Sequence, residues 1–273
     1  NIDWWVQAPA SRNTLASPFF HNYCVLHLVE HLVAEQQFEF KYILVDSPVM
    51  KRSIENIIKP VTHQNCSVQY SRRKFIIKRI FKTSSLSIYI HALRRLVQYA
   101  ISHSTRRSFS LGLPKVPVTL IDTFISANYV SSNRWYGGLW DNMLKRQQNC
   151  TFFVPTVVNT PMVKMRKMYI EIRKGVRNNL IKDDLLKASD LLFACRFRYR
   201  LKAIYLRQLS VCGCKIAPLV LEEWKTSKDV PTIIESLLTY RFIYRLKQKY
   251  KEVRLAIDWF EGQSIDKAWN LGF

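Results

Sequence analysis

The stretch VPVTLIDTFI, residues 116–125, is the clearest fold signal in this chain of 273 residues. It is short, rich in β-branched side chains and almost continuously apolar, which is typical of a strand, and we expect this strand to end at Asp122. Comparable runs stand at 149–160 (NCTFFVPTVVNT), at 253–260 (VRLAIDWF) and at 38–48 (FEFKYILVDSP). We therefore predict several buried strands.

Apolar residues at helical spacing fill the segments between these runs. They are clearest over 17–37, 49–59, 161–210 and 217–251, the last of which is broken near Pro231. Alternation of strands and helices predicts an α/β fold, namely a Rossmann-like parallel sheet with flanking helices. A chain of this length forms one large domain or two small ones.

The charge is strongly basic, with 42 Lys and Arg against 20 Asp and Glu and a net charge of +22. Such a field favours anionic partners, which are nucleic acids, anionic membrane surfaces or phosphorylated substrates. No acidic residue occurs between Glu55 and Asp122, and twelve Lys and Arg lie in that interval.

Within this interval, a basic helical insertion at about 70–110 combines apolar and basic residues at helical spacing, as in LSIYIHALRRLVQYAI at 86–101. One interpretation is a nucleic-acid surface, on which Tyr70, Phe75 or Tyr89 stack on bases. Another is a helix lying on an anionic membrane, and a third is an ordinary solvated face. The apolar residues are mostly Ile, Leu and Phe, so we favour the membrane, and nucleic acid is the lesser expectation.

The sequence offers little sign of a metal or of export. His27, Glu30 and His31 fit an H-x-x-E-H zinc pattern, but the long acid-free interval offers no third ligand, so we expect ordinary positions on a packed helix. Six scattered cysteines suit a reducing compartment, and no apolar run approaches the ~20 residues that span a bilayer. We expect no cofactor and a cytoplasmic protein resting on the inner membrane face.

Polar residues recur where the predicted strands end, and ligands of open α/β sheets bind beyond those ends. The pairs Asp46-Ser47, Asp122-Thr123 and Pro155-Thr156 stand at such places. Helix N-capping explains about half of them. It explains the run from Trp259 to Gln263 less well, because two aromatic rings beside Glu and Gln suit a sugar-sized pocket.

The segment IDWFEGQSIDKAWNLGF at 257–273 resembles part of the bacterial surface-carbohydrate-biosynthesis proteins, glycosyltransferases of the GT-B type, in which W-F-E-x-Q precedes D-K/R and N-x-G-F. RWYGGLWDNM at 134–143 and FFVPTVV at 152–158 are similar to the family's R-x-Y-x-G-L and F-V-P-T elements. IDWWVQAPASRN at 2–13 resembles its opening strand and loop. The sequence WYGGLW departs from the usual Y-Y-P-G-L, which leaves the role of that loop open.

The resemblance implies the N-terminal half of a GT-B fold, against which the acceptor binds. We expect an acceptor-side domain over 1–258 and, over 259–273, the start of the crossing to a donor domain. Because the chain stops at Phe273 inside the motif, we expect a fragment that is inactive alone. The whole enzyme would transfer a sugar from a nucleotide donor, its co-substrate, to a cell-surface polysaccharide or lipid-linked acceptor. The alternative is a basic nucleic-acid-binding protein without catalysis.

Sugar transfer needs a base that takes the proton of the acceptor hydroxyl. Our candidates are Glu261 and Asp258. The expected substrate-binding residues, which pack on a sugar ring or hold its hydroxyls, are Trp259, Phe260, Gln263, Asp266, Asp122 and Arg134. The opposing interpretation is that Glu261 only caps the following helix.

Overall fold

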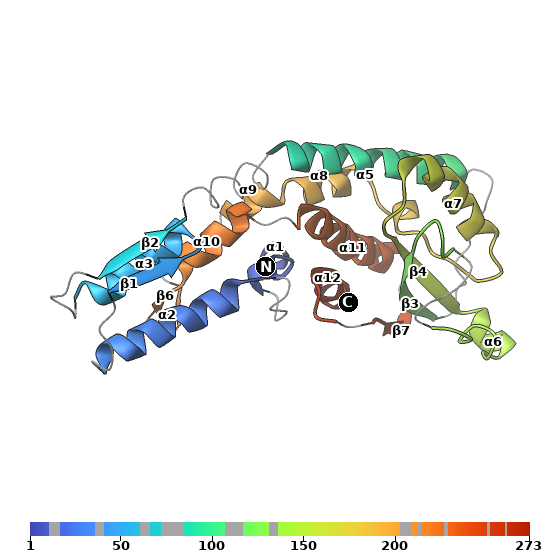
Figure 1. Cartoon of the computed structure of the whole chain (residues 1–273). Coiled ribbons are helices and arrows are strands. Elements are labelled where there is room, and N and C mark those ends of the chain that lie inside the picture. Colours follow the sequence, from blue (N-terminus) through green and yellow to red (C-terminus); the bar gives the residue numbers. More distant parts are fainter. Residues whose placement is uncertain are drawn as a thin grey trace. The chain divides into compact units, whose positions relative to one another are not determined.

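A computed structural model (Figure 1) gives the structure of the chain in two compact units. Unit 1 comprises Asp3–Ile88 and Arg198–Val230, and unit 2 comprises Tyr89–Phe197 and Pro231–Phe273. The structure describes residues 1–10, 17–35, 41–60, 66–71, 85–106, 117–130, 136–202, 209–211, 214–226, 229–249, 252–259 and 261–273.

Unit 1 contains a pair of parallel strands between helices. Its elements are α1 (Ile2–Trp5), η1 (Ala8–Ala10), α2 (Phe19–Ala34), β1 (Tyr42–Val45), α3 (Pro48–Ile58), β2 (Ser67–Tyr70), most of α9 (Phe197–Lys202), β5 (Ser210–Val211), β6 (Cys214–Lys215) and α10 (Ala217–Thr226). Strands β1 and β2 pair in parallel, joined by the crossover helix α3, whereas β5 and β6 form a short antiparallel pair.

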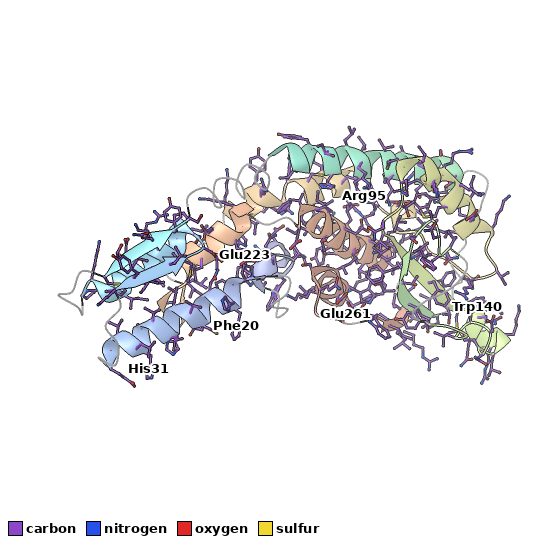
Figure 2. The ribbon with its side chains drawn as sticks, in the orientation of Figure 1. Phe20, His31, Arg95, Trp140, Glu223 and Glu261 are labelled. Carbon is purple, nitrogen blue, oxygen red and sulfur yellow. The ribbon has the colours of Figure 1, made fainter. Side chains whose placement is uncertain are left out.

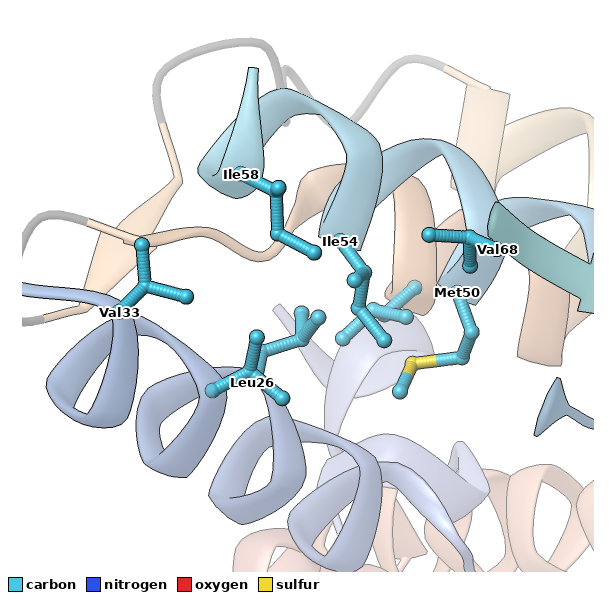
Figure 3. Packing of buried hydrophobic residues seen from close by; sticks show 8 residues of the cluster. Leu26, Val33, Met50, Ile54, Ile58 and Val68 are labelled. Atoms are coloured by element: carbon cyan, nitrogen blue, oxygen red, sulfur yellow. The ribbon is translucent and has the colours of Figure 1, made fainter. Parts of the chain in front are cut away.

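The core of unit 1 is aliphatic. Leu26 and Val33 of α2 face Met50 and Ile54 of α3, and all four side chains are buried (Figure 3). Ser47 caps α3, because its Oγ accepts from the backbone N of Met50 at 3.1 Å, and it also donates to Glu222 Oε2 of α10 at 2.7 Å. Ser47, which follows β1, is thus a structural residue, in agreement with the helix N-capping interpretation of Asp46-Ser47.

Unit 2 is built around a three-stranded parallel sheet in the order β4–β3–β7. Its elements are α5 (Ser85–Arg106, from Tyr89 onward), β3 (Val118–Ile125), α6 (Lys145–Gln148), β4 (Thr151–Val157), α7 (Met162–Lys174), η2 (Lys182–Asp184), α8 (Ala188–Cys195), α11 (Val230–Lys249), β7 (Val253–Ile257) and α12 (Ser264–Gly272). In this sheet Ile121 of β3 is opposite Phe153 of β4 and Ile257 of β7.

Both faces of this sheet are covered, which explains the continuous apolar runs in its strands. On one face, Ile125 packs with Met165 and Met168 of α7. On the other, the Lys182 ammonium bonds to the hydroxyls of Thr156 on β4 and Thr239 on α11, so α11 lies over that side. Figure 1 shows α7 and α11 on different sides of the strands.

The prediction of an α/β fold with parallel strands and flanking helices is confirmed. One point differs: the described strands form two parallel sheets, one in each unit, where the alternation suggested a single sheet. Sequence periodicity predicts strands, but the choice of partner depends on contacts far apart along the chain. The helix at 86–101 is present as α5. The proposed limits 1–258 and 259–273 stay a prediction.

Candidate functional site

The parallel sheet of unit 2 brings two of the candidate carboxylates side by side. Ile121 pairs with Ile257 in parallel register, so Asp122 and Asp258 are the next residues along β3 and after β7. Asp122 is only 3% exposed, whereas Asp258 is half-buried and reaches solvent. Asp258 directly follows β7 at the carboxyl edge of the sheet, where α/β proteins bind ligands. Asp122 lies within β3, which continues to Ile125, so the strand end expected at Asp122 was wrong.

The surroundings raise the pKa of both carboxyls. Burial raises the pKa of Asp122 to about 6; the Lys182 ammonium opposes this rise, and the carboxyls of Asp266 and Glu235 add to it. Burial likewise raises the pKa of Asp258 to about 7, with further increases from Asp266 and Asp122 and opposition from Lys182. The edge of the sheet therefore holds carboxyls that exchange protons near neutral pH.

Each of these two carboxyls has an oxygen that makes no hydrogen bond within the described part of the chain. These are Oδ1 of Asp122 and Oδ1 of Asp258, both shielded from solvent. Among the described residues, the second oxygen of Asp258 accepts one long bond, 3.4 Å, from Asn270 Nδ2. Buried polar atoms without partners are rare in folded proteins and often mark sites that bind something.

Sequence reasoning missed two neighbours of these carboxyls. Lys182 is 2% exposed and supplies the positive charge, with its Nζ 2.8 Å from Thr239 Oγ1 and 3.8 Å from Glu235 Oε1. Tyr136 lies close enough that burial, followed by Asp122 and Asp258, raises its pKa to about 12. Lys182 follows no strand end or motif, so nothing in the sequence distinguishes it from the other basic residues.

The carboxylate of Asp266 has a structural role. It is 2% exposed, and its Oδ2 accepts hydrogen bonds from the backbone N of Glu261 and of Gln263, both at 2.9 Å. Asp266 thereby caps the N-terminus of α12, which is the role that the opposing interpretation assigned to Glu261. The capped oxygen of Asp266 is not available for a sugar hydroxyl, although the side chain still raises the pKa of Asp258.

Glu261 lies in the exposed segment between β7 and α12 (Figure 2). Its two oxygens accept from Trp259 Nε1 at 2.9 Å and from Gln263 Nε2 at 2.7 Å. Trp259 is 43% exposed. The candidates of this segment thus contact one another at the surface, whereas Asp258 turns toward the sheet. Phe260 and Arg134, the two remaining candidates, lie outside the described residues.

A cavity of about 580 Å³ lies in unit 2, and the sequence did not indicate it. Its lining includes Thr123 and Ile125 of β3, the rings of Trp140 and Phe153, and Arg177, whose guanidinium lies 5.6 Å from the Phe153 ring centre. Because side chains alternate along a strand, Thr123 and Ile125 face away from Asp122. The cavity and the carboxyl pair are therefore separate features, although the volume suits a small ligand.

The H-x-x-E-H pattern on α2 does not assemble a metal centre among the described side chains. His27 Nδ1 lies 3.5 Å from Glu30, and His31 Nε2 lies 3.1 Å from Glu35, and the four side chains are 39–59% exposed. No group of three or more His, Cys, Asp or Glu gathers in metal-binding geometry within the described ranges.

No protein-family model matches the chain, and searches of curated proteins and of solved structures give no significant match. Of the helices that the structure describes, none combines the length and the apolar character needed to cross a bilayer. The function must be inferred from the geometry of unit 2 and from the sequence motifs.

Proposed function

We propose that the chain is the acceptor-side half of a GT-B-type glycosyltransferase, which transfers a sugar from a nucleotide donor to a cell-surface polysaccharide or lipid-linked acceptor. The motifs at 134–143, 152–158 and 257–273 support this proposal by their resemblance to that family. A parallel α/β sheet that ends in carboxyls is compatible with it, because such edges bind ligands.

The observation that carries the proposal is the state of Asp258. Asp258 is only partly buried, and its carboxyl has an oxygen without a hydrogen-bond partner among the described residues and a pKa raised to about 7. A general base is most effective when its pKa is near the working pH. Asp122, buried behind it, contributes to that raised pKa.

In this reaction Asp258 takes the proton from the acceptor hydroxyl while the hydroxyl oxygen forms a bond to the anomeric carbon of the donor. The bond from the anomeric carbon to the phosphate oxygen breaks, and its electron pair leaves with the nucleotide. Glu261 is the second candidate base, but its oxygens are engaged by Trp259 and Gln263. Trp259 and Phe260 remain the proposed sugar-packing residues.

The test compares Asp258→Asn with Glu261→Gln in the full-length gene product, using Glu252→Gln, an exposed position just before β7, as the control. We expect Asp258→Asn to lower kcat for sugar transfer about 10²–10⁴-fold and to remove the acid limb of the pH–rate profile near pH 7. Circular dichroism should show an intact fold.

Two other outcomes are informative. Transfer that survives Asp258→Asn but is lost in Glu261→Gln would assign the base to Glu261. Transfer that is unchanged in both variants, or not detected with any nucleotide sugar in the unsubstituted protein, would remove the proposal.

A further inference from the structure

Among its described side chains, helix α5 buries four polar ones and exposes five large apolar ones. The inward residues, 0–9% exposed, are Arg95, Gln98, Ser102 and Thr105. The outward residues are 40–70% exposed, and we call them the apolar face of α5. They are Tyr89, Ile90, Leu93, Leu96 and Val97. At 3.6 residues per turn, each set forms one stripe and the two stripes lie on opposite sides of the helix. A surface helix normally has the reverse arrangement.

Ion pairs hold the inward stripe in place. Arg95 Nη2 lies 2.7 Å from Asp183 Oδ1, and Arg95 Nε lies 3.2 Å from Glu235 Oε2 on α11. Figure 2 shows Arg95 on the inner side of α5. Gln98 Nε2 donates to the Tyr169 hydroxyl at 2.9 Å, and that hydroxyl donates to Asp183. Arg95 and Gln98 therefore belong to one connected buried network.

A second set of bonds holds the C-terminal half of α5. Arg173 of α7 donates from Nε to Thr105 Oγ1 at 3.2 Å and from Nη2 to Ser102 Oγ at 3.3 Å. Turning α5 about its axis to bury the apolar face would break both sets and leave the buried carboxylate of Asp183 without its arginine partner, which is strongly unfavourable. The apolar face is thus fixed outward by the polar contacts beneath it.

The charges around the apolar face indicate what covers it. Among the described residues, Arg94 and Arg106 of α5 are exposed, and α7, which contacts α5 through Tyr169 and Arg173, carries exposed Lys164, Arg166 and Lys167. A second copy of this chain or another basic protein would bring like charges together. A bilayer with anionic lipids offers an apolar layer to the apolar side chains and negatively charged headgroups to the Lys and Arg.

We propose that the apolar face of α5 docks on the surface of a lipid bilayer that contains anionic lipids. Leu93 and Leu96 enter the boundary between headgroups and acyl chains, and the neighbouring Lys and Arg lie among the headgroup phosphates. This docking goes beyond sugar transfer, and its test requires neither donor nor acceptor.

The experiment is flotation of the 273-residue chain with vesicles of phosphatidylcholine alone or mixed equally with phosphatidylglycerol. We expect binding to the mixed vesicles, weaker binding to phosphatidylcholine and loss of binding as salt rises. Leu93→Glu/Leu96→Glu should lower the partition coefficient at least about tenfold, and Leu93→Gln/Leu96→Gln should lower it less, because the glutamates also repel the headgroups.

The matched control is Leu144→Glu/Leu271→Glu, which makes the same change at exposed leucines of unit 2 outside α5 and should bind nearly as the unsubstituted chain does. Since Leu93 and Leu96 are exposed, the melting temperatures of all variants should stay close to that of the unsubstituted chain, which excludes misfolding as the cause.

Several results would overturn the proposal. These are equal flotation of the Leu93→Glu/Leu96→Glu variant, binding to oligonucleotides without binding to vesicles, or a dimer that this variant converts to monomer. Asp258→Asn should float normally whether or not it transfers sugar, so failure of the docking and failure of the transferase are distinguishable.

Discussion

Unit 2 buries carboxylates in two regions that differ in how their charges are met. Beneath α5 and α8, each buried carboxylate is bonded to arginine: Asp183 to Arg95, Asp184 to Arg173, and Asp190 to Arg241 and Arg245. At the carboxyl edge of the sheet, Asp122 and Asp258 each retain a shielded oxygen without a hydrogen-bond partner among the described residues. A basic residue nearby is therefore not sufficient to give a buried carboxylate a hydrogen-bonded partner for each oxygen.

The pKa of Asp190 and that of Asp122 move in opposite directions. Burial raises the pKa of Asp190, but the hydrogen bonds from Arg245, the backbone N of Lys187 and Arg241 outweigh it, so the pKa is lowered. At the sheet edge burial prevails, because Lys182 is shared among several acids, and the pKa of Asp122 rises to about 6. The charged form of Asp190 therefore stabilises the fold at neutral pH, whereas the charged forms of Asp122 and Asp258 destabilise it, as expected of a functional site.

The largest expected effect is from breaking the paired region at Asp183. Asp183→Asn removes the carboxylate that meets Arg95, leaving a buried guanidinium with Glu235 as its only remaining acidic partner. We expect a loss of roughly 3 kcal/mol in the free energy of unfolding, because one member of a buried ion pair is removed. Urea denaturation at pH 7 measures it, and Asp141→Asn, an exposed carboxylate of the same unit, should change it by less than about 0.5 kcal/mol. A loss of unfolding free energy no larger than that of Asp141→Asn would mean that the paired region contributes little to stability.

A smaller effect, of opposite sign, is expected from Asp122→Asn. Because the folded-state pKa of Asp122 is raised from 3.8 to about 6, the folded protein binds the proton more tightly than the unfolded chain. Its contribution is fully present below about pH 4 and is lost as the pH rises through about 6. At pH 8 we expect Asp122→Asn to raise the free energy of unfolding by about 1–2 kcal/mol, less than the shift alone implies because the amide is also buried.

The measurement is urea denaturation of both proteins between pH 5 and pH 8. The difference between them should shrink toward pH 5, where Asp122 is largely protonated. A variant that is destabilised at every pH would show that Asp122 holds a structural bond, and the contrast between the two regions would fail.

Local sequence patterns predicted the elements of unit 2 well but not their partners. The run 116–125 predicted β3 because a strand covered on both faces needs apolar side chains at nearly every position. Pro155 did not exclude 151–157 from the sheet, because β4 lies at one end of the strand order, where the missing N–H matters less. The separation of β1 and β2 into another unit depends on aliphatic contacts among α2, α3 and β2 that periodicity does not encode.

Only those residues of the candidate site that lie in a strand or directly after one could be predicted from the sequence. Asp122 and Asp258 were identifiable because each belongs to a predicted strand or directly follows one, and parallel register then brings them together. Lys182 and Glu235 come from a 3₁₀ turn and from helix α11, and no sequence spacing relates them to the sheet. The inverted burial of α5 was equally hidden, since its amphipathic period is the same whichever stripe faces inward.

The smallest expected effect is from Glu261→Gln, which tests whether the exposed carboxylate differs from Asp258, three residues away. Glu261 is exposed, and the described hydrogen bonds of its carboxylate are to Trp259 and Gln263 of the same segment. We therefore expect the free energy of unfolding to change by less than about 0.5 kcal/mol at any pH from 5 to 8. Asp258→Asn, in contrast, should flatten the pH dependence near pH 7 because it removes a group whose pKa is about 7 only in the folded protein. If Glu261→Gln gave the same flattening, the group that binds a proton near pH 7 would lie in the exposed segment. The carboxyls of the sheet edge would then not differ from those at the surface.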